Sequence, residues 1–338
     1  MMLVVDLLII ASAITIGFTA HRASLCNVRA VAEVMYCGTA PMLRSFAKSI
    51  LWTTLVAGTS VLWLDVPQPT VLARIPIGFA IVGGVTFGIG AAINQGCSLS
   101  TLRRLADGDV SMLVTLFGAV AGVATWMLTG PAWFSTSLTA TVSPWTRWPV
   151  ASGTVVFALW NWAMVELWIL WRSNDQGSLR DRVLAPTYGL SAAAAIIGVA
   201  GGILYALQGA WSFTNFVRTV VGSAFGVETA TAWHALLVSA LLAGMIGSSI
   251  QRRSFSLQTA ALSGGWRRRF GGGWLMGLGG ALIPGGNDTL LLSSLPALSL
   301  QATFAYAAML AGIAATLFAM KRRSSDMGIG MRAPDLPR

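Results

Sequence analysis

Cysteine is the residue type in this chain best suited to chemistry, and one of the three cysteines lies in an unusual setting. Cys97 stands in the triplet Gly96-Cys97-Ser98, directly after an apolar stretch rich in glycine. We expect the stretch to break there and a new helix to begin, so that its first backbone N–H groups lack partners and attract anions. A thiol at such a helix start tends toward the thiolate, and Ser98 adds a hydroxyl donor. The triplet therefore predicts a place where a soft sulfur and several donors meet an anion.

The other two cysteines carry weaker signals. Cys26 lies in a second short segment of the same kind, whereas Cys37 has no motif around it and is interpreted as structural. For Cys26 and Cys97 the alternative is also packing, because free cysteines are often small buried hydrophobes. Three cysteines without a CxxC pair predict neither a zinc site nor a disulfide framework. The sequence has no haem, flavin, nucleotide or metal motif, so we expect no cofactor.

The elements that position these residues are membrane helices. Of the 338 residues 55% are apolar and only 10% are charged, against roughly 25% charged in a soluble domain. Apolar runs close to the length that crosses a bilayer recur along the whole chain. We predict an all-α polytopic protein with nine spans, at about 3–20, 42–64, 75–94, 110–130, 150–171, 186–207, 229–250, 270–284 and 300–320.

The positive charges indicate orientation. Nineteen of the 22 Lys and Arg follow the odd-numbered spans or lie in the tail, and the other three are Arg74, Arg147 and Arg218. By the positive-inside rule, we expect the N-terminus outside and the C-terminus in the cytoplasm of a bacterial inner membrane. The basic excess thus indicates topology, and nucleic acid is not an expected partner.

An internal duplication organises the chain. Val28-Arg29 falls on Val217-Arg218 at an offset of 189 residues. Because this offset separates the halves by five spans, the two halves cross the membrane in opposite senses. We predict a first inverted repeat at 1–130, a connector at 131–185, a second repeat at 186–323 and a tail at 324–338, an architecture typical of secondary transporters. The same offset places Gly83, Gly84, Gly88, Gly90 and Gly96 on Gly272, Gly273, Gly277, Gly279 and Gly285.

Short segments that join the spans are the candidates for the transport site. Irregular backbone at membrane depth survives only where it is buried or lines a cavity. The offset pairs Cys26 with Asn215 and Cys97 with Gly286, so we predict that these four residues meet around one constriction. In the second half Pro284 ends a helix, and Asn287 or Asp288 caps the next. The expected re-entrant segments are 22–38, 97–107, 211–225 and 286–297.

Two arginines near membrane depth have two interpretations. A charge there is costly, and Arg29 and Arg218 either contact an anion or pair internally. Glu33, four residues after Arg29, and Glu228, ten after Arg218, are the candidate partners. The sequence leaves both alternatives open. For Glu166, a lone acid in a span, packing or pairing is expected.

These motifs resemble a known family. The order Gly17-Phe18, His21-Arg22, Cys26, Arg29 and then Gly84-x3-Gly88-x-Gly90-x5-Gly96-Cys97 is similar to that of the YeeE/YedE sulfur transport membrane proteins, over essentially the whole chain. The resemblance implies an all-helical hourglass in which cysteines line a narrow path for thiosulfate or a related sulfur or selenium compound. It also implies cooperation with a small cytosolic sulfur-carrier protein.

The chain departs from the family pattern at two positions. The third family cysteine falls on Gly286, and His21 replaces the more usual glutamine. We expect that Gly286→Cys, which restores the family pattern, alters rate or substrate preference without disturbing the fold.

Two classes of function follow. The first is a transporter or channel for a small sulfur-containing anion, with membrane lipid as its other partner. The second is an integral membrane sulfurtransferase that forms a persulfide on Cys97. No general base stands near Cys97 in sequence, and nucleophilic cysteine chemistry normally needs one, so we expect no enzyme. The expected path residues are Cys97, Cys26, Gly96, Ser98, Gly286, Asn287, Asn215, Arg29 and Arg218.

Overall fold

The protein is built of helices of two lengths. The computed structural model describes residues 2–63, 76–130, 145, 148–173, 185–226, 231–258, 265–283 and 285–326. No β-strand occurs in these ranges, where one isolated bridge joins Asp109 to Gln258. The all-helical prediction is therefore confirmed. The long helices are α1 (Met2–Ala23), α3 (Pro41–Trp63), α4 (Ile77–Asn94), α6 (Met112–Thr129), α9 (Pro149–Ser173), α11 (Leu190–Gln208), α13 (Ala232–Arg252), α14 (Trp266–Leu282) and α16 (Leu300–Asp326).

Seven of the described helices are long and apolar enough to cross a membrane, namely α1, α4, α6, α9, α11, α13 and α16. The protein is thus a multi-pass membrane protein. The remaining two long helices coincide with the second and eighth expected spans. Of these, α3 carries Arg44 and Lys48, and α14 has 17 residues with arginines at 267–269 in its first turn.

Four short elements follow long helices after a break. They are α2 (Asn27–Cys37), α5 (Ser98–Ala106), α12 (Phe213–Ala224) and the pair α15 (Asn287–Thr289) and η2 (Leu290–Ser294). The first three match expected re-entrant segments. The fourth differs from a plain helix, because one α-helical turn continues as a five-residue π-helix. Gln95 and Gly285 adopt the left-handed region at φ +59° and +116° where the chain turns back; Pro284 lies outside the described residues.

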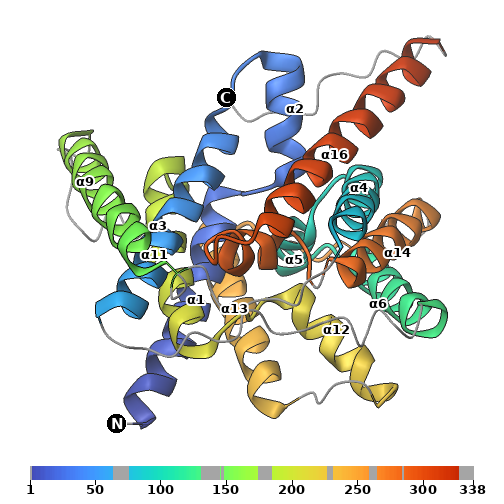
Figure 1. Ribbon diagram of the computed structural model, residues 1–338. Helices are drawn as coiled ribbons and strands as arrows, with labels where there is room; N and C mark the ends of the chain where they lie inside the picture. The colour runs from blue at the N-terminus through green and yellow to red at the C-terminus, as the bar shows by residue number, and fades with distance from the viewer. Residues whose placement is uncertain are drawn as a thin grey trace.

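The two glycine-rich helices α4 and α14 pack against each other (Figure 1, right). A β-carbon added at Gly83 would lie 3.1 Å from the Gly279 carbonyl oxygen, and one at Gly90 would lie 2.6 Å from that of Gly272. Early residues of α4 thus face late residues of α14, and late residues of α4 face early ones. The two helices are antiparallel, and their backbones approach closely because neither has side chains at these positions.

Four other closely packed helix pairs are parallel. Along α1 and α13, Gly244 lies against Ile14 and Phe18, and His21 lies against Ser248. Along α4 and α16, Gly84 lies against Ala305 and Gly88 against Met309. The pairs α3 with α11 and α6 with α14 run parallel in the same way. A shift of 189 residues converts α1·α13 into α11·α3, and α4·α16 into α14·α6, so both halves use the same contacts.

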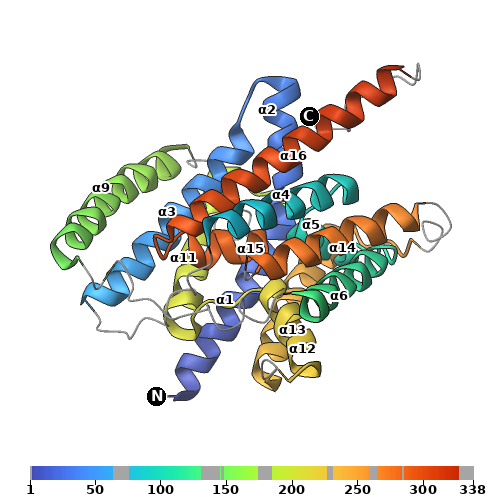
Figure 2. The ribbon, with the colours of Figure 1, turned by 45° about the vertical axis from the view of Figure 1, so that its right-hand side comes forward.

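Helix α9 stands at the edge of the molecule and packs on α3 (Figure 2). Its Trp162 ring lies 5.5 Å from the ring of Trp52, centroid to centroid. Its Glu166 accepts a hydrogen bond from Lys48 Nζ at 2.5 Å, which confirms that this acid is paired. Among the described helices, none corresponds to α9 at the 189-residue offset.

Candidate functional site

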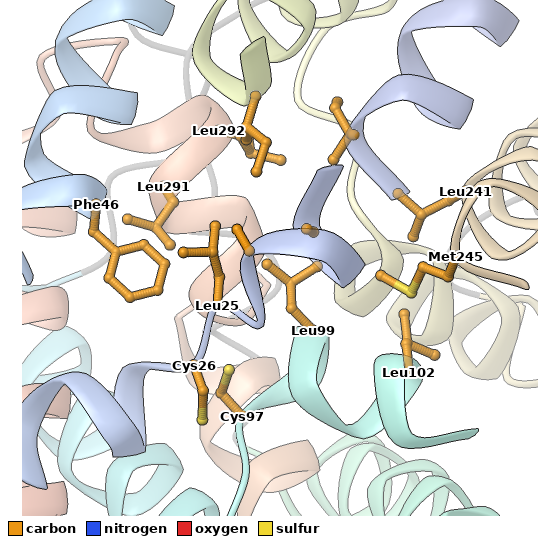
Figure 3. Packing of buried hydrophobic residues seen from close by; sticks show 14 of the residues in the cluster. Leu25, Cys26, Phe46, Cys97, Leu99, Leu102, Leu241, Met245, Leu291 and Leu292 are labelled. Carbon is orange, nitrogen blue, oxygen red and sulfur yellow. The ribbon is translucent and has the colours of Figure 1, made fainter. Parts of the chain in front are cut away.

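Two cysteines from different segments lie side by side inside the bundle. Cys26 is the N-cap residue of α2, and Cys97 is the N-cap residue of α5. Their side chains are adjacent among leucines (Figure 3), and both are buried, with Cys97 only 1% exposed. Cys26 Sγ donates to Ser100 Oγ at 3.5 Å. The first turns of two helices thus meet at two thiols, and the backbone N–H groups of Asn27, Arg29 and Ser100 face the two sulfur atoms.

The second half supplies a different chemistry at the equivalent break. Gly286 is the N-cap residue of α15, and its N–H donates to Thr214 Oγ1 at 2.6 Å. The Thr214 hydroxyl and backbone N–H both donate to the Asp288 carboxylate, at 2.5 and 3.1 Å. Where the first half has two thiols, the second half has a network of hydroxyl, amide and carboxylate groups.

One of the hydrogen bonds that join the two halves at this site links residues separated by the repeat offset. Ser98 Oγ donates to Asn287 Oδ1 at 2.5 Å, and these residues are 189 positions apart in the chain. They are therefore equivalent under the 189-residue offset found in the sequence. The expected clustering of Cys26, Cys97, Asn215 and Gly286 around one constriction stays a prediction.

Asn215 and Arg218 form a group of their own. Asn215 Nδ2 donates to the Ala210 carbonyl at 3.1 Å, and Asn215 Oδ1 accepts from Arg218 Nε at 3.3 Å. Asn215 thus begins α12 near Thr214, but no described contact joins it to Cys26 or Cys97. Glu228, the proposed partner of Arg218, lies outside the described residues.

Arg29 is not paired with Glu33, contrary to one of the two alternatives. Glu33 Oε2 accepts from the Met42 N–H at 3.2 Å, and no ion pair joins it to Arg29 among the described residues. The Arg29 Nε atom is buried and has no hydrogen-bond partner there. The Nε–H group of Arg29, three residues after Cys26, therefore remains available to a ligand.

Asn94 holds the first break, although it was not selected from the sequence. Its Nδ2 donates to the Gly96 carbonyl at 3.1 Å, and its Oδ1 accepts from Thr115 Oγ1 at 2.8 Å. A β-carbon at Gly96 would lie 2.5 Å from Ser100 Oγ, so any larger residue there requires the Ser100 side chain to move. The signal for Asn94 was a polar side chain at the end of an apolar span.

A small cavity lies beside Ser98, between α6, α12 and α14. About 30 Å³ of it is accessible to water, enough for one or two molecules. Its polar lining includes Ser98, Thr214 and Arg218, whereas neither Cys26 nor Cys97 lines it. The cavity ends before the thiols, so packed side chains separate them from it in this conformation.

A second polar cluster ties the end of α1 to other helices. His21 is fully buried, and its two ring nitrogens lie 2.9 Å from Ser248 Oγ and from Asp107 Oδ1. Asp107 also accepts from Ser249 at 2.9 Å and from Ser254 at 2.7 Å. Burial alone would raise the pKa of Asp107, but these hydrogen bonds, led by that of His21, lower its pKa to about 2. These contacts fix the His21 side chain in place, so we assign His21 a structural role.

Gly286 corrects one expectation. A β-carbon at this position would lie 2.7 Å from Thr214 Cγ2 and 2.9 Å from Phe87 Cε2, closer than real β-carbons come. A cysteine here requires both neighbours to move, so Gly286→Cys would not leave the local fold undisturbed. Cys37 is exposed at the end of α2, apart from the other thiols. Among the described residues no three His, Cys, Asp or Glu side chains gather as metal ligands.

Helices that cross a membrane and short helices that meet at buried thiols define a polytopic membrane protein with an internal site. Residues 22–315 match the sulphur transport family, and the chain belongs to this YeeE/YedE family. The match includes both breaks and nearly all the described helices, and it makes the protein a sulfur-related membrane transporter. No curated protein matches the chain.

Proposed function

We propose that the protein is an inner-membrane transporter or channel that passes a small sulfur-containing anion, thiosulfate or a related compound, along a central path. The path residues are Cys97, Cys26, Gly96, Ser98, Gly286, Asn287, Asn215, Arg29 and Arg218. The observation that carries the proposal is the meeting of Cys26 and Cys97 at the starts of α2 and α5. A soft thiol interacts with the terminal sulfur of such an anion, while N–H groups at helix starts stabilise its oxygens.

The directions of the helices support nine spans in two inverted repeats. In a chain that alternates sides, parallel helices have positions of equal parity. With nine spans α1 and α13 are first and seventh, and α4 and α16 are third and ninth, as their parallel packing requires. With seven spans these pairs would be first and sixth, and second and seventh, and would have to be antiparallel. The antiparallel contact of α4 with its repeat equivalent α14 fits inversion.

The closed packing around the thiols fits a path that opens in steps. Carriage requires weak, sequential contacts, because a tight site would retain the ion. The cavity at Ser98, Thr214 and Arg218 stops short of Cys97. We infer that an anion held there reaches the thiols only when Ser98, Asn287 and their neighbours separate.

Uptake of ³⁵S-thiosulfate by cells or vesicles that carry the protein tests this proposal. Wild type is expected to accumulate label, and Cys97→Ala and Cys97→Ser are expected to lose at least about tenfold, the equivalent of ~1.4 kcal/mol at the barrier. Cys37→Ala, the same change at an exposed thiol, is the matched control and should retain wild-type uptake. Full uptake by Cys97→Ala would reduce that cysteine to a packing role.

The same experiment addresses the sulfurtransferase alternative. In that reaction the Cys97 thiolate attacks the outer sulfur of thiosulfate, the S–S bond breaks, sulfite leaves and a persulfide remains on Cys97. Outer-sulfur label that stays on the washed, denatured protein and is released by a dithiol reductant would favour the enzyme. Unchanged thiosulfate inside the vesicles favours the transporter.

A further inference from the structure

Asn27 and Asn287 are buried asparagines near the thiols whose side-chain N–H donors the proposed function has not used. We propose that the side-chain amides of Asn27 and Asn287 bind the oxygen atoms of the transported anion and so determine specificity for oxygen-bearing sulfur anions. The inference rests on the proposed function, because it assigns the substrate class to the same central site. Asn27 belongs to none of the motifs singled out from the sequence.

Asn27 is the first residue of α2 and follows Cys26 directly. Its side chain is completely buried, and its Oδ1 accepts a hydrogen bond from the Tyr306 hydroxyl at 3.1 Å. Its Nδ2, with two N–H donors, has no partner among the described residues. The backbone N–H of Asn27 faces the Cys97 sulfur. Asn27 is thus next to Cys26 in the chain and in contact with Cys97 in space.

Asn287 repeats this arrangement in the other half of the chain. It is also completely buried, its Oδ1 accepts from Ser98 Oγ at 2.5 Å, and its Nδ2 has no described partner. In both cases a hydroxyl from the opposite repeat holds the amide oxygen, from Tyr306 for Asn27 and from Ser98 for Asn287. Because the oxygen is held, the N–H₂ group of each amide is presented as a fixed donor.

The remaining buried orphan atoms point to the same kind of ligand. Seven buried side-chain atoms lack partners among the described residues, and six of them are nitrogen donors. Four of those donors lie within the first turns of the broken helices or just before them: Asn27 Nδ2, Arg29 Nε, Trp211 Nε1 and Asn287 Nδ2. No side-chain carboxylate is orphaned with them. A ligand that satisfies only donors must itself be a strong acceptor.

Burying N–H donors without hydrogen-bond partners is unfavourable, which argues that these donors serve a ligand. A buried N–H without a partner is destabilising, and the two amides leave several hydrogen bonds unmade among the described residues. The oxygens of thiosulfate or sulfite would make them, whereas sulfur and halide acceptors hydrogen-bond weakly. A site built for donors also rejects an analogue without oxygens, since its donors then stay unpaired. The thiols contact the sulfur end, and the amides contact the oxygen end.

Binding to the purified full-length protein tests the assignment without any need for transport. Thermal unfolding is followed in detergent with sodium thiosulfate, sodium sulfite or, at matched ionic strength, sodium bromide. The wild type is expected to be stabilised by the oxygen-bearing anions and not by bromide. Asn27→Asp and Asn287→Asp keep the size of the side chain and its held oxygen but remove both donors. They should bind thiosulfate at least about tenfold more weakly, the loss of ~1.4 kcal/mol.

Matched controls separate binding from folding. Gln258→Glu makes the corresponding change in an exposed segment outside the helices, where the amide donates to the Ser256 hydroxyl. Tyr306→Phe removes the hydroxyl that fixes Asn27 and should weaken thiosulfate binding a few-fold without a new charge. Tyr36→Phe removes an exposed hydroxyl that donates to the Leu317 carbonyl and should change nothing. Tyr306→Phe remains informative if an aspartate variant does not fold.

The outcomes are distinct for the two proposals. Wild type that binds thiosulfate but transports none refutes the transport function and leaves the amide assignment standing. Wild type that transports, with Asn27→Asp and Tyr306→Phe binding thiosulfate as it does, overturns the assignment and leaves transport standing. Wild type stabilised equally by bromide and thiosulfate also overturns it, because oxygens are then not what is recognised.

Discussion

At Gly286 the hydrogen-bond network of Thr214 and Asp288 occupies the space that a cysteine side chain would need. The Thr214 hydroxyl accepts from the Gly286 N–H and donates to Asp288, which fixes its methyl group against the glycine. The first half uses sulfur at this position, and the second half uses a hydroxyl. Restoring a cysteine therefore competes with an existing hydrogen-bond network.

We predict that Gly286→Cys lowers thermal stability. The closest contact is 2.7 Å to Thr214 Cγ2, and forcing extra atoms into a packed core costs typically 1–3 kcal/mol, which corresponds to a few degrees in Tm. Thr214→Ser removes that methyl group and keeps the hydroxyl, so Gly286→Cys combined with Thr214→Ser should recover part of the loss. Thermal unfolding of the three variants measures it. A Gly286→Cys protein as stable as wild type would contradict the packing argument.

The sequence predicted those site residues that a local sequence pattern marks. Cys97, Ser98 and Asn287 were selected because a glycine break precedes a helix start, a local pattern. Thr214, Tyr306 and Asn27 were not, because each acts through a partner 74 to 279 positions away. Such partnerships depend on how re-entrant segments dock. The absence of an Arg29–Glu33 ion pair among the described residues has the same cause, because the Glu33 carboxylate accepts a hydrogen bond from the Met42 N–H on the next helix.

At the scale of elements, the loop from 107 to 111 fastens three helices together. Asp107 follows α5, and its Oδ1 receives His21 from α1 and Ser249 from α13. The hydrogen bonds outweigh burial, so the folded-state pKa of about 2 lies below the ordinary value near 3.9. A group of this kind stabilises the fold above pH ~4, and its contribution is lost as the pH falls from about 4 to about 2.

We therefore predict a pH-dependent effect of Asp107→Asn. At pH 7 the variant should unfold several degrees below wild type, for a loss of about 1–2 kcal/mol after allowance for partial exposure. Toward pH 3 the gap should narrow, because Asp107 is protonated in the unfolded chain below pH ~4 while the folded state keeps it ionised down to its pKa of about 2, so proton uptake then favours unfolding of the wild type. Thermal unfolding between pH 7 and pH 3 checks this, with Asp6→Asn in the first turns of α1 as the control. A gap that does not change with pH would show that the charge is not what holds the loop.

The elements themselves followed from apolar length. Runs near 20 residues predicted the helices at α1, α4 and α6, and moderately apolar segments too short to cross predicted α2, α5 and α12. The π-helical turn after Thr289 was not predictable, because α- and π-helical turns share one apolar pattern and differ only in hydrogen-bond register. The segments α3 and α14 are ambiguous by composition for a physical reason. Basic residues near their ends lower their apolarity without shortening the helix.

At the scale of the molecule, the number of spans decides which parts share a side of the membrane. Cys37 ends α2, and Val150 begins α9 with an exposed side chain. Between them lie α3, α4 and α6. With nine spans all three helices cross, so the two positions are on opposite sides. With seven spans α3 does not cross, and they are on the same side. This difference is independent of the absolute orientation.

We predict that the native Cys37 is cytoplasmic and that a cysteine at position 150 is external. In intact spheroplasts a membrane-impermeant maleimide should label the double variant Val150→Cys/Cys37→Ala but not wild type, whose Cys26 and Cys97 are buried. In inside-out vesicles the pattern should reverse, with Cys37→Ala alone as the unlabelled control. A fluorescent reporter fused after Arg338 should fold in the cytoplasm, on the side of the nineteen basic residues. Labelling of both positions from one side would remove α3 from the spans, and with it the inversion of the two halves on which the central path depends.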